Sequence, residues 1–160
     1  MTKEEPNKMY WSGRALSHWL RNIIKQMGDA QWAPDYIVGV ARGGLVPAVM
    51  LSHHFEVPLS VIYVSFRDRP IVGTVTPTIN SEQRRRILVV DDINDSGATL
   101  QYIDDNLVDV GLANCEVKYA VLLDKVSSDF EVDYCGEAVL NNNEWHVFPW
   151  EEVFMPVPLN

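Results

Sequence analysis

Three carboxylates and two hydroxyls lie close together in one short stretch of the chain. Asp91 and Asp92 follow the apolar run Ile87–Val90, and a third acid begins the run Asp95–Thr99, which also holds the hydroxyls. An apolar, β-branched run of this length is typical of a buried strand. The small and hydroxyl-bearing residues after it are typical of a helix start that binds phosphate. Because acids can bind hydroxyls or a metal while N–H groups and hydroxyls bind phosphate, the stretch predicts a sugar-phosphate site.

The same residues resemble the phosphoribosyl pyrophosphate (PRPP) binding motif of the type I phosphoribosyltransferases. Two hydrophobic residues, two acids, a short spacer and then Asp-Ser/Thr-Gly-x-Thr form a much more specific pattern than a glycine-rich loop alone. The alternative is a solvated acidic turn that caps the next helix, but capping requires only one Asp or Ser. The resemblance implies that the PRPP-binding residues here are Asp91, Asp92, Asp95, Ser96, Gly97, Ala98 and Thr99.

Composition limits the kind of protein this is. The chain has 160 residues, of which 47% are hydrophobic, so we expect a single domain, 1–160, with one core. No apolar run is long enough to span a membrane, and the first residues lack the apolar segment of a secretory signal. These features predict a cytoplasmic protein without a membrane partner. Cys115 and Cys135 have no metal-ligand spacing and are expected to be buried free thiols.

Charge weighs against one class of partner. The net charge of −9 argues against a broad nucleic-acid surface, which requires a basic face. It does not argue against phosphate binding, because a few N–H groups and cations suffice for that. The basic cluster Arg84–Arg86 has two interpretations: a solvated loop that protects the following strand from aggregation, or positive charge near a polyphosphate.

Strands and helices are expected to alternate along the chain. Ser12 can cap the first helix, and the first eight or nine residues are expected to be frayed. This first helix is predicted to end near residue 27, and two further helices are predicted over 45–55 and 98–110. Strands are predicted over 36–41, 59–66, 87–90, 116–123 and 138–140. This alternation predicts an α/β fold, a parallel sheet flanked by helices. Its ligand would lie at the carboxyl ends of the strands, where Arg42, Ser65, Asp91 and Lys125 fall.

Two glycines follow the first of these strands. Gly43 and Gly44 would let the backbone approach an anion, and Arg42 would add a positive charge at the start of a helix. An ordinary strand-to-helix turn is the alternative. Here the segment resembles the pyrophosphate loop of the purine phosphoribosyltransferases, which implies pyrophosphate contacts from Arg42 and Gly43. It also implies that the Ala41–Arg42 peptide bond is cis.

The acids have separate expected tasks. Adjacent carboxylates on a strand point to opposite sides, so they do not share one role. By resemblance they face the ribose hydroxyls and a Mg²⁺ ion held by pyrophosphate, and we assign the metal contact to Asp92. By the same resemblance Asp95 approaches N7 of the purine, where it would accept a proton as the base attacks the sugar. Asp95 could instead cap the helix, and both roles can coexist.

The base end of the site is expected from two later segments. Lys125 follows a segment that resembles the part of the 6-oxopurine phosphoribosyltransferases whose lysine contacts the exocyclic O6, which would select against adenine. The aromatic tail resembles that of xanthine-guanine phosphoribosyltransferases, which implies that Trp145 stacks on the purine and the backbone of His146 reads its edge. A core or interface role is the alternative for such a tail. Trp150 and Glu151 are expected to be structural, and the role of the His146 side chain is open.

The segment 67–86 has no convincing period, which is typical of a functional lid or a disordered segment, and a short β-hairpin within it is an option. We assign a flexible lid to about 66–86. Its start resembles the Ser-Tyr dipeptide of the family lid, although Phe66 lacks the tyrosine hydroxyl. A closing lid would exclude water from PRPP. The residues assigned to it are Ser65, Phe66, Arg67 and Arg69, and a small C-terminal hood over the base is assigned to 136–155.

Together these resemblances imply a 6-oxopurine phosphoribosyltransferase of the type I fold, acting in purine salvage. It would use Mg²⁺, PRPP and guanine, xanthine or hypoxanthine, without nucleic acid, as a homodimer or homotetramer. Two alternatives are kept. One is a regulatory protein of this fold that senses PRPP or nucleotides, and the other is a phosphoribosyltransferase for a different base.

Overall fold

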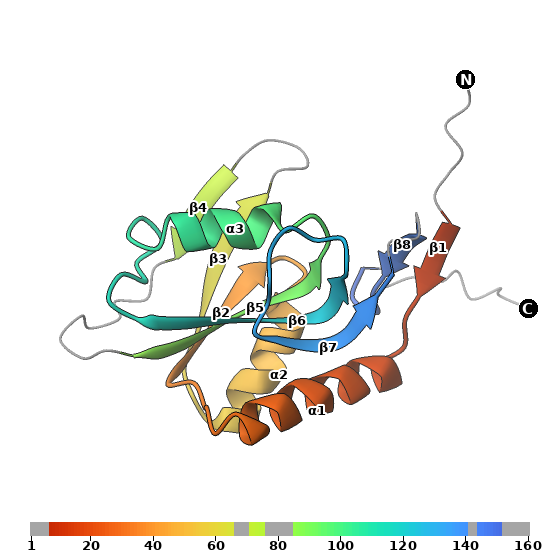
Figure 1. Cartoon of the computed structure of the whole chain (residues 1–160), viewed down its shortest axis with the longest axis horizontal. Helices are drawn as coiled ribbons and strands as arrows, with labels where there is room; N and C mark the ends of the chain where they lie inside the picture. Colours follow the sequence, from red (N-terminus) through yellow and green to blue (C-terminus); the bar gives the residue numbers. More distant parts are fainter. Residues whose placement is uncertain (1–6, 66–70, 76–84, 141–143, 152–160) are drawn as a thin grey trace, which may run out of the picture.

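Six strands form the central sheet of the protein (Figure 1). A computed structural model describes residues 7–65, 71–75, 85–140 and 144–151. The order of the strands across the sheet is β4-β3-β2-β5-β6-β7. Neighbouring strands are parallel, except that β3 and β4 are antiparallel. The strands are β2 (Tyr36–Ala41), β3 (Leu59–Ser65), β4 (Ile71–Val75), β5 (Arg86–Asn94), β6 (Glu116–Lys125) and β7 (Tyr134–Val139).

Helices cover both faces of this sheet, as the α/β prediction requires. Figure 1 shows α3 (Ala98–Asp105) on one face and α1 (Gly13–Asp29) with α2 (Leu45–Phe55) on the other. Side chains of the central strand β5 alternate between the two cores. Leu88 and Val90 pack with the α1 and α2 side, whereas Val89 packs with the α3 side. The same alternation sends the next two side chains, both acids, to opposite faces.

The first helix forms where its sequence pattern places it. Ser12 is the N-cap, and its side chain accepts a hydrogen bond from the backbone N–H of Ala15. The apolar side chains at three- and four-residue steps are buried: Leu16, Trp19, Leu20, Ile23 and Met27. The helix continues two residues beyond its predicted end, to Asp29.

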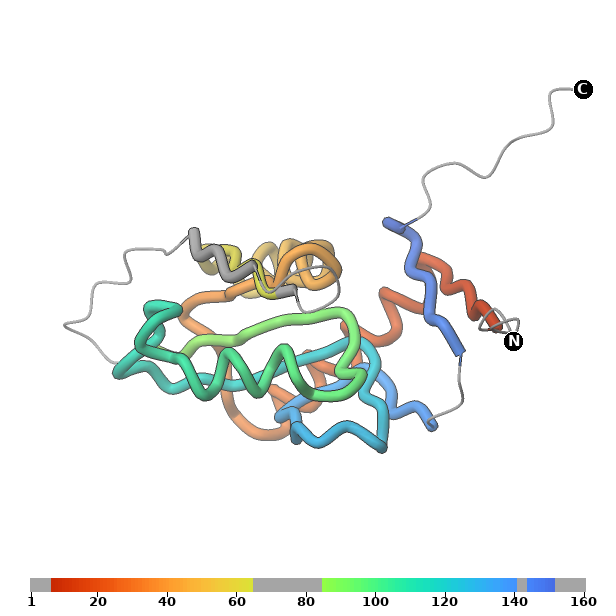
Figure 2. Tube along the Cα trace, turned by 90° about the horizontal axis from the view of Figure 1, so that it is seen from above, coloured from red at the N-terminus to blue at the C-terminus, as the bar shows by residue number. Residues whose placement is uncertain are grey.

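A second, two-stranded sheet joins the two ends of the chain. Strand β1 (Asn7–Tyr10) pairs in parallel with β8 (Glu144–Val147). Figure 2 shows this pair to one side of the central sheet. The prediction of a frayed start was therefore wrong for residues 7–9. Each strand has four residues, and β1 is exposed throughout, so neither carries a hydrophobic pattern that would reveal it.

Several predicted boundaries differ from the structure. Helix α3 ends at Asp105 rather than at 110, because Asn106 turns its side chain back to donate to the carbonyl of Tyr102. Strand β5 continues through the acids to Asn94 instead of ending at 90. Strand β6 runs two residues longer than predicted and β7 begins four residues earlier, at Tyr134. In the predicted lid, 71–75 forms β4 and pairs with β3 as a hairpin, and most of the remainder lies outside the described residues.

Candidate active site

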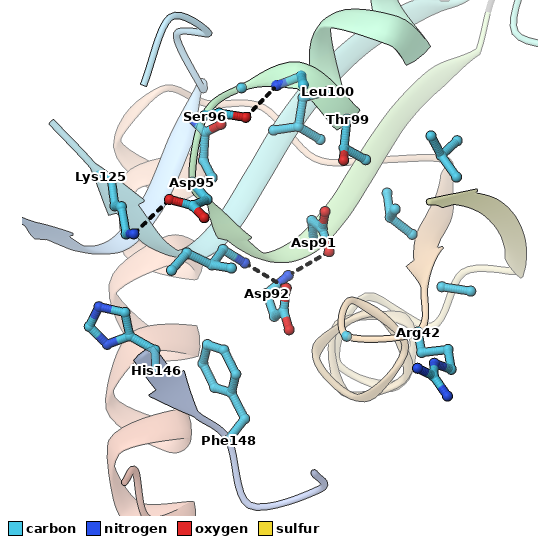
Figure 3. Close-up of a pocket in the computed structure, with 18 of the residues that line it drawn as sticks. Arg42, Asp91, Asp92, Asp95, Ser96, Thr99, Leu100, Lys125, His146 and Phe148 are labelled. Carbon is cyan, nitrogen blue, oxygen red and sulfur yellow. Dashed lines mark hydrogen bonds and ion pairs between the residues drawn. The ribbon is translucent and has the colours of Figure 1, made fainter. Parts of the chain in front are cut away.

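One pocket gathers residues from the carboxyl ends of β2, β5 and β6 and from β8 (Figure 3). Its volume is about 710 Å³, which suits a small-molecule ligand. The lining includes these residues singled out in the sequence: Arg42, Gly43, Asp91, Asp92, Asp95, Ser96, Gly97, Ala98, Thr99, Lys125, Trp145 and His146. The assigned lid residues Phe66, Arg67 and Arg69, and the side chain of Ser65, lie outside the described part of the chain.

The loop after β2 lies directly against the acid pair. The Ala41–Arg42 peptide bond is cis, as the resemblance implies. A Cβ added at Gly43 would lie 1.9 Å from Oδ2 of Asp92, and one added at Gly44 would lie 2.3 Å from the carbonyl oxygen of Val90. Both glycines are therefore required by close approach. The Arg42 side chain is exposed and points away from the acids in Figure 3.

Asp91 and Asp92 point in opposite directions from the end of β5 (Figure 3). Oδ1 of Asp91 accepts from the backbone N–H of Asp92 at 2.9 Å, and Oδ1 of Asp92 accepts from that of Ile93 at 2.8 Å. Burial raises the pKa of the Asp92 carboxyl above its ordinary value, and the negative charge of Glu151 adds to this rise. A cation bound beside Asp92 would offset this cost of burial and favour the charged carboxylate.

The loop from Asp95 into α3 has the geometry of an anion site. Gly97 is the residue before the helix and has a φ of +87°, which favours glycine. A Cβ there would also lie 2.7 Å from the backbone nitrogen of Phe130. Helix α3 begins at Ala98, so the first N–H groups of the helix lie in the loop that lines the pocket.

Asn94 supports this loop from behind, and sequence reasoning missed it. It is 1% exposed, and its side-chain amide donates to Oδ1 of Asp124 and to the carbonyl of Phe130, both at 2.8 Å. Its oxygen accepts from the hydroxyl of Ser128 at 2.9 Å. These bonds fix the segment after β6 against the loop after β5. Its partners Ser128 and Phe130 lie more than thirty residues away, so no local sequence pattern indicated this role.

Lys125 and Asp95 form an ion pair across the pocket. Nζ of Lys125 lies 2.6 Å from Oδ1 of Asp95, and Figure 3 shows the two side chains pointing toward one another. The lysine side chain is only 11% exposed, whereas that of the aspartate is 57% exposed. A lysine buried to this degree is not simply a solvated surface residue. The pair joins the loop before α3 to the end of β6.

The strand β8 and the turn after it form another wall. Trp145 is 41% exposed, and His146 and Phe148 are buried. Trp150 stacks on Phe148 with ring centroids 4.8 Å apart and planes at 5°. Glu151 accepts a hydrogen bond from the backbone N–H of Phe148 at 2.8 Å, which supports the structural role expected for it. Both Trp150 and Glu151 also line the pocket.

Sequence reasoning also missed Trp11, which lies between α1 and β1. Its indole N–H donates to Nδ1 of His146 at 3.1 Å, and its ring packs edge-on against Trp19. Phe148 belonged to the aromatic tail but was assigned no role. The contact of Trp11 with β8 joins residues at opposite ends of the chain, so no local pattern could reveal it.

Three general features complete the description. In the described ranges no three His, Cys, Asp or Glu side chains are grouped as metal ligands. None of the helices there is both long and apolar enough to cross a lipid bilayer. Cys115 and Cys135 are free thiols, as predicted, but they are half-buried rather than buried.

Comparison with known proteins agrees with this geometry. The phosphoribosyl transferase domain model matches residues 10–153. The crystal structure of a purine phosphoribosyltransferase from Pyrococcus horikoshii is similar with a TM-score of 0.73 and 33% identity, covering 91% of this chain and 95% of that one. A xanthine-guanine phosphoribosyltransferase of Idiomarina loihiensis is 28% identical over 72% of this chain and 70% of its own length. The transcriptional regulator GfcR of Methanococcoides burtonii is 23% identical over 67% of this chain. The matched part covers 53% of the length of that regulator, so this chain spans about half of it.

The parallel sheet, its flanking helices and the acid-and-hydroxyl loop at the strand ends define a type I phosphoribosyltransferase fold. Since the domain model covers most of the sequence, the chain belongs to the phosphoribosyl transferase domain family.

Proposed function

We propose that this protein is a 6-oxopurine phosphoribosyltransferase that acts in purine salvage. It transfers the phosphoribosyl group of PRPP to N9 of guanine, xanthine or hypoxanthine and releases pyrophosphate. The observation that carries the proposal is the composition of the pocket at the carboxyl ends of the strands. The loop Asp91–Thr99 lines it together with Lys125 and the aromatic strand β8, so a sugar phosphate and a planar base can bind side by side.

In this reaction the bond between C1′ and the pyrophosphate oxygen breaks, and the bond between C1′ and N9 forms. The loop at the start of α3 binds the 5′-phosphate through backbone N–H groups and the hydroxyls of Ser96 and Thr99. Asp95 accepts the proton from N7 as the base attacks. Proton transfer of this kind contributes roughly 10²–10⁴-fold, and positioning and charge stabilisation supply much of the rest. Lys125, which holds Asp95 in the free protein, faces O6 of the base.

The donor set fits a Mg²⁺ ion that arrives with PRPP. Mg²⁺ is bound by one or two carboxylates together with substrate oxygens and water. Asp92 has its carboxylate against the Gly43 backbone, and Asp91 lies on the other side of the strand facing the sugar hydroxyls. The ion would neutralise charge on the departing pyrophosphate, and Asp92 is the residue that would hold it.

The remaining expectations extend this proposal. The whole chain acts as one domain, with a lid over 66–86 that excludes water and a hood over 136–155 that covers the base. The protein is cytoplasmic and assembles as a homodimer or homotetramer, which exposed apolar side chains such as Met9, Tyr10 and Met50 support. Light scattering at increasing protein concentration tests the assembly, and a constant monomer mass would contradict it.

A regulatory protein of this fold is the second candidate. The similarity to the regulator GfcR favours it, and so would retained PRPP binding without turnover. The net charge of −9 weighs against direct binding to nucleic acid. A phosphoribosyltransferase for another base is the remaining alternative, and it would be favoured if Trp145 formed no wall for the base or if Lys125 pointed away from the site.

The decisive experiment measures pyrophosphate release from PRPP and Mg²⁺ with guanine, xanthine, hypoxanthine, adenine, uracil and orotate. Release with at least one 6-oxopurine, and little with the other three bases, is expected. Turnover of uracil or orotate alone would replace the purine assignment. PRPP binding in a calorimeter without turnover of any base would favour the regulator, and absence of both would refute the proposal.

A further inference from the structure

The imidazole of His146 is held in one orientation by Trp11. The indole N–H of Trp11 donates to Nδ1 at 3.1 Å, and the two rings stack with centroids 5.9 Å apart and planes at 13°. Rotating the imidazole by 180° would place a carbon against the indole N–H and lose this hydrogen bond. The position of the other ring nitrogen, Nε2, therefore follows from the contact with Trp11.

This contact also fixes where the proton of the imidazole lies. Burial lowers the pKa of His146 below its ordinary value, and the positive charge of Lys125 adds to this effect. The ring is therefore neutral near pH 7 and carries one proton. Since Nδ1 accepts a hydrogen bond, that proton is on Nε2.

The Nε2–H group is buried without a partner. His146 is only 9% exposed, and Nε2 has no hydrogen-bond partner within the part of the chain that the structure describes. A buried donor left unpaired is unfavourable, and most buried polar groups in proteins are satisfied. His146 lines the pocket together with Lys125, and both lie on the same side of it in Figure 3. The missing acceptor is therefore expected on a ligand.

The chemistry of two adjacent donors narrows the nature of that acceptor. Lys125 carries donors only, and neutral His146 offers one donor at Nε2. A carbonyl oxygen has two lone pairs and can accept a hydrogen bond from each of these two donors. An amino group would instead place its own hydrogens against the hydrogens of the two donors. We propose that the side chain of His146 is a specificity-determining contact that donates from Nε2 to the oxo oxygen of the bound base, beside Lys125. This inference rests on the proposed function, because it requires a base in the pocket.

Two substitutions separate the donor from the structural contact. His146→Asn keeps an oxygen that can accept from Trp11 but has no group that reaches the position of Nε2. His146→Gln places an amide N–H near that position and gives up the contact with Trp11. Inosine monophosphate probes the whole pocket, and ribose 5-phosphate probes only its phosphate end.

Calorimetry with these two ligands gives the first test. His146→Asn is expected to weaken binding of inosine monophosphate by about tenfold, while ribose 5-phosphate binds within twofold of the wild type. His146→Gln is expected to recover most of the lost affinity. Equal loss for both ligands, or no loss for inosine monophosphate, would overturn the inference. Weaker binding with Gln but not with Asn would show that the contact with Trp11, rather than the donor, matters.

Nuclear magnetic resonance of wild-type protein with ¹⁵N-labelled histidine gives a second readout that does not depend on activity. Inosine monophosphate is expected to shift the Nε2–H signal of His146 downfield and slow its exchange with water, and adenosine monophosphate is not. An unchanged signal in the presence of bound inosine monophosphate would mean that water satisfies Nε2, and the inference would fail while the enzyme assignment stands. If no nucleotide binds to the wild type, the proposed function fails and this inference with it.

Discussion

The two ends of the pocket are built in different ways. The end that we propose binds phosphate, called the phosphate end, is one continuous stretch, Asp91–Thr99, at the junction of β5 and α3. The end that we propose binds the base, called the base end, combines Lys125 from β6, His146 from β8 and Trp11 from the far end of the chain. The first can be recognised from neighbouring residues, and the second exists only after the chain has folded. Under the proposed function, local sequence thus specifies the phosphate contact, and long-range packing specifies the choice of base.

The strands that carry the two ends of the pocket also differ in how firmly neighbouring strands hold them. β5 is paired with β2 on one side and β6 on the other, within a six-stranded sheet. β8 belongs to a two-stranded sheet, an arrangement that is only marginally stable alone. The contacts of Trp11 and Phe148 with Trp19 therefore hold β8 against the rest of the molecule. Substitutions in this aromatic cluster should alter the base end and leave the phosphate end intact.

Asp95 lies where the two ends meet, and replacing it should have the largest effect. Asp95→Asn removes the proton acceptor and is expected to lower kcat by about a hundredfold. Binding of inosine monophosphate should be retained, because the amide can still occupy the same place. Steady-state kinetics and calorimetry measure the two quantities. An unchanged kcat would remove Asp95 from the proton-transfer role.

The next largest effect is expected from a substitution that acts only on the phosphate end of the pocket. In Gly43→Ala the added Cβ would lie 1.9 Å from the Asp92 carboxylate, so loop and acid must separate. We expect KM for PRPP to rise by about tenfold with little change in the preference among bases. Gly28→Ala is the matched control, because nothing lies within 4 Å of its added Cβ. A change in base preference with unaltered KM for PRPP would contradict the division of the pocket.

The reciprocal perturbation acts on the base end. Lys125→Ala removes the donor expected at O6, so discrimination of hypoxanthine against adenine should fall by roughly tenfold in kcat/KM. It also releases Asp95 from its 2.6 Å ion pair, and Lys125→Gln, which keeps a neutral donor, shows how much of the effect is due to charge. Adenine that remains equally excluded in both variants would refute the O6 assignment.

The smallest expected effect is on stability. The pKa of His146 is lowered by folding from its ordinary value of 6.5, so below about pH 6.5 the unfolded chain binds a proton that the folded chain does not. The free energy of unfolding should therefore fall with decreasing pH, by no more than about 1.4 kcal/mol per pH unit from this group. Urea unfolding of wild type and His146→Asn between pH 5 and 8 isolates the contribution. Parallel curves for the two proteins would exclude it.

The elements that the sequence predicts best are those whose signal is local. The bounds of β2 and α2 match the prediction, because an apolar run and the Gly-Gly break define them without help from the rest of the chain. The start of α3 was placed correctly at Ala98, but its end was not. The Asn, Asp and Val residues between Asp105 and Gly111 have low helix propensity, because their side chains bond to the backbone or lose rotamers in a helix. Gly111 therefore ends the series of turns that follows α3, not the helix itself.

The same limit applies to the site. All the predicted PRPP-binding residues line the pocket, since the motif is contiguous. Nothing near Asn94 in the sequence reveals that Phe130 and Ser128 will complete its hydrogen bonds. Likewise nothing near His146 reveals Trp11. Roles that depend on partners brought together by the sheet order could only be found from the folded structure.

The parallel pairing of β1 with β8 has a practical consequence for handling this protein. Residues 7–10 supply one edge of the small sheet that carries Trp145 and His146, and Trp11 follows at once. Deleting the first residues of the chain from an expressed protein would thus remove the strand that pairs with β8 at the base end of the pocket. Affinity tags placed there are best joined through a spacer, and fragments that begin at α1 are poor surrogates for measuring nucleobase preference.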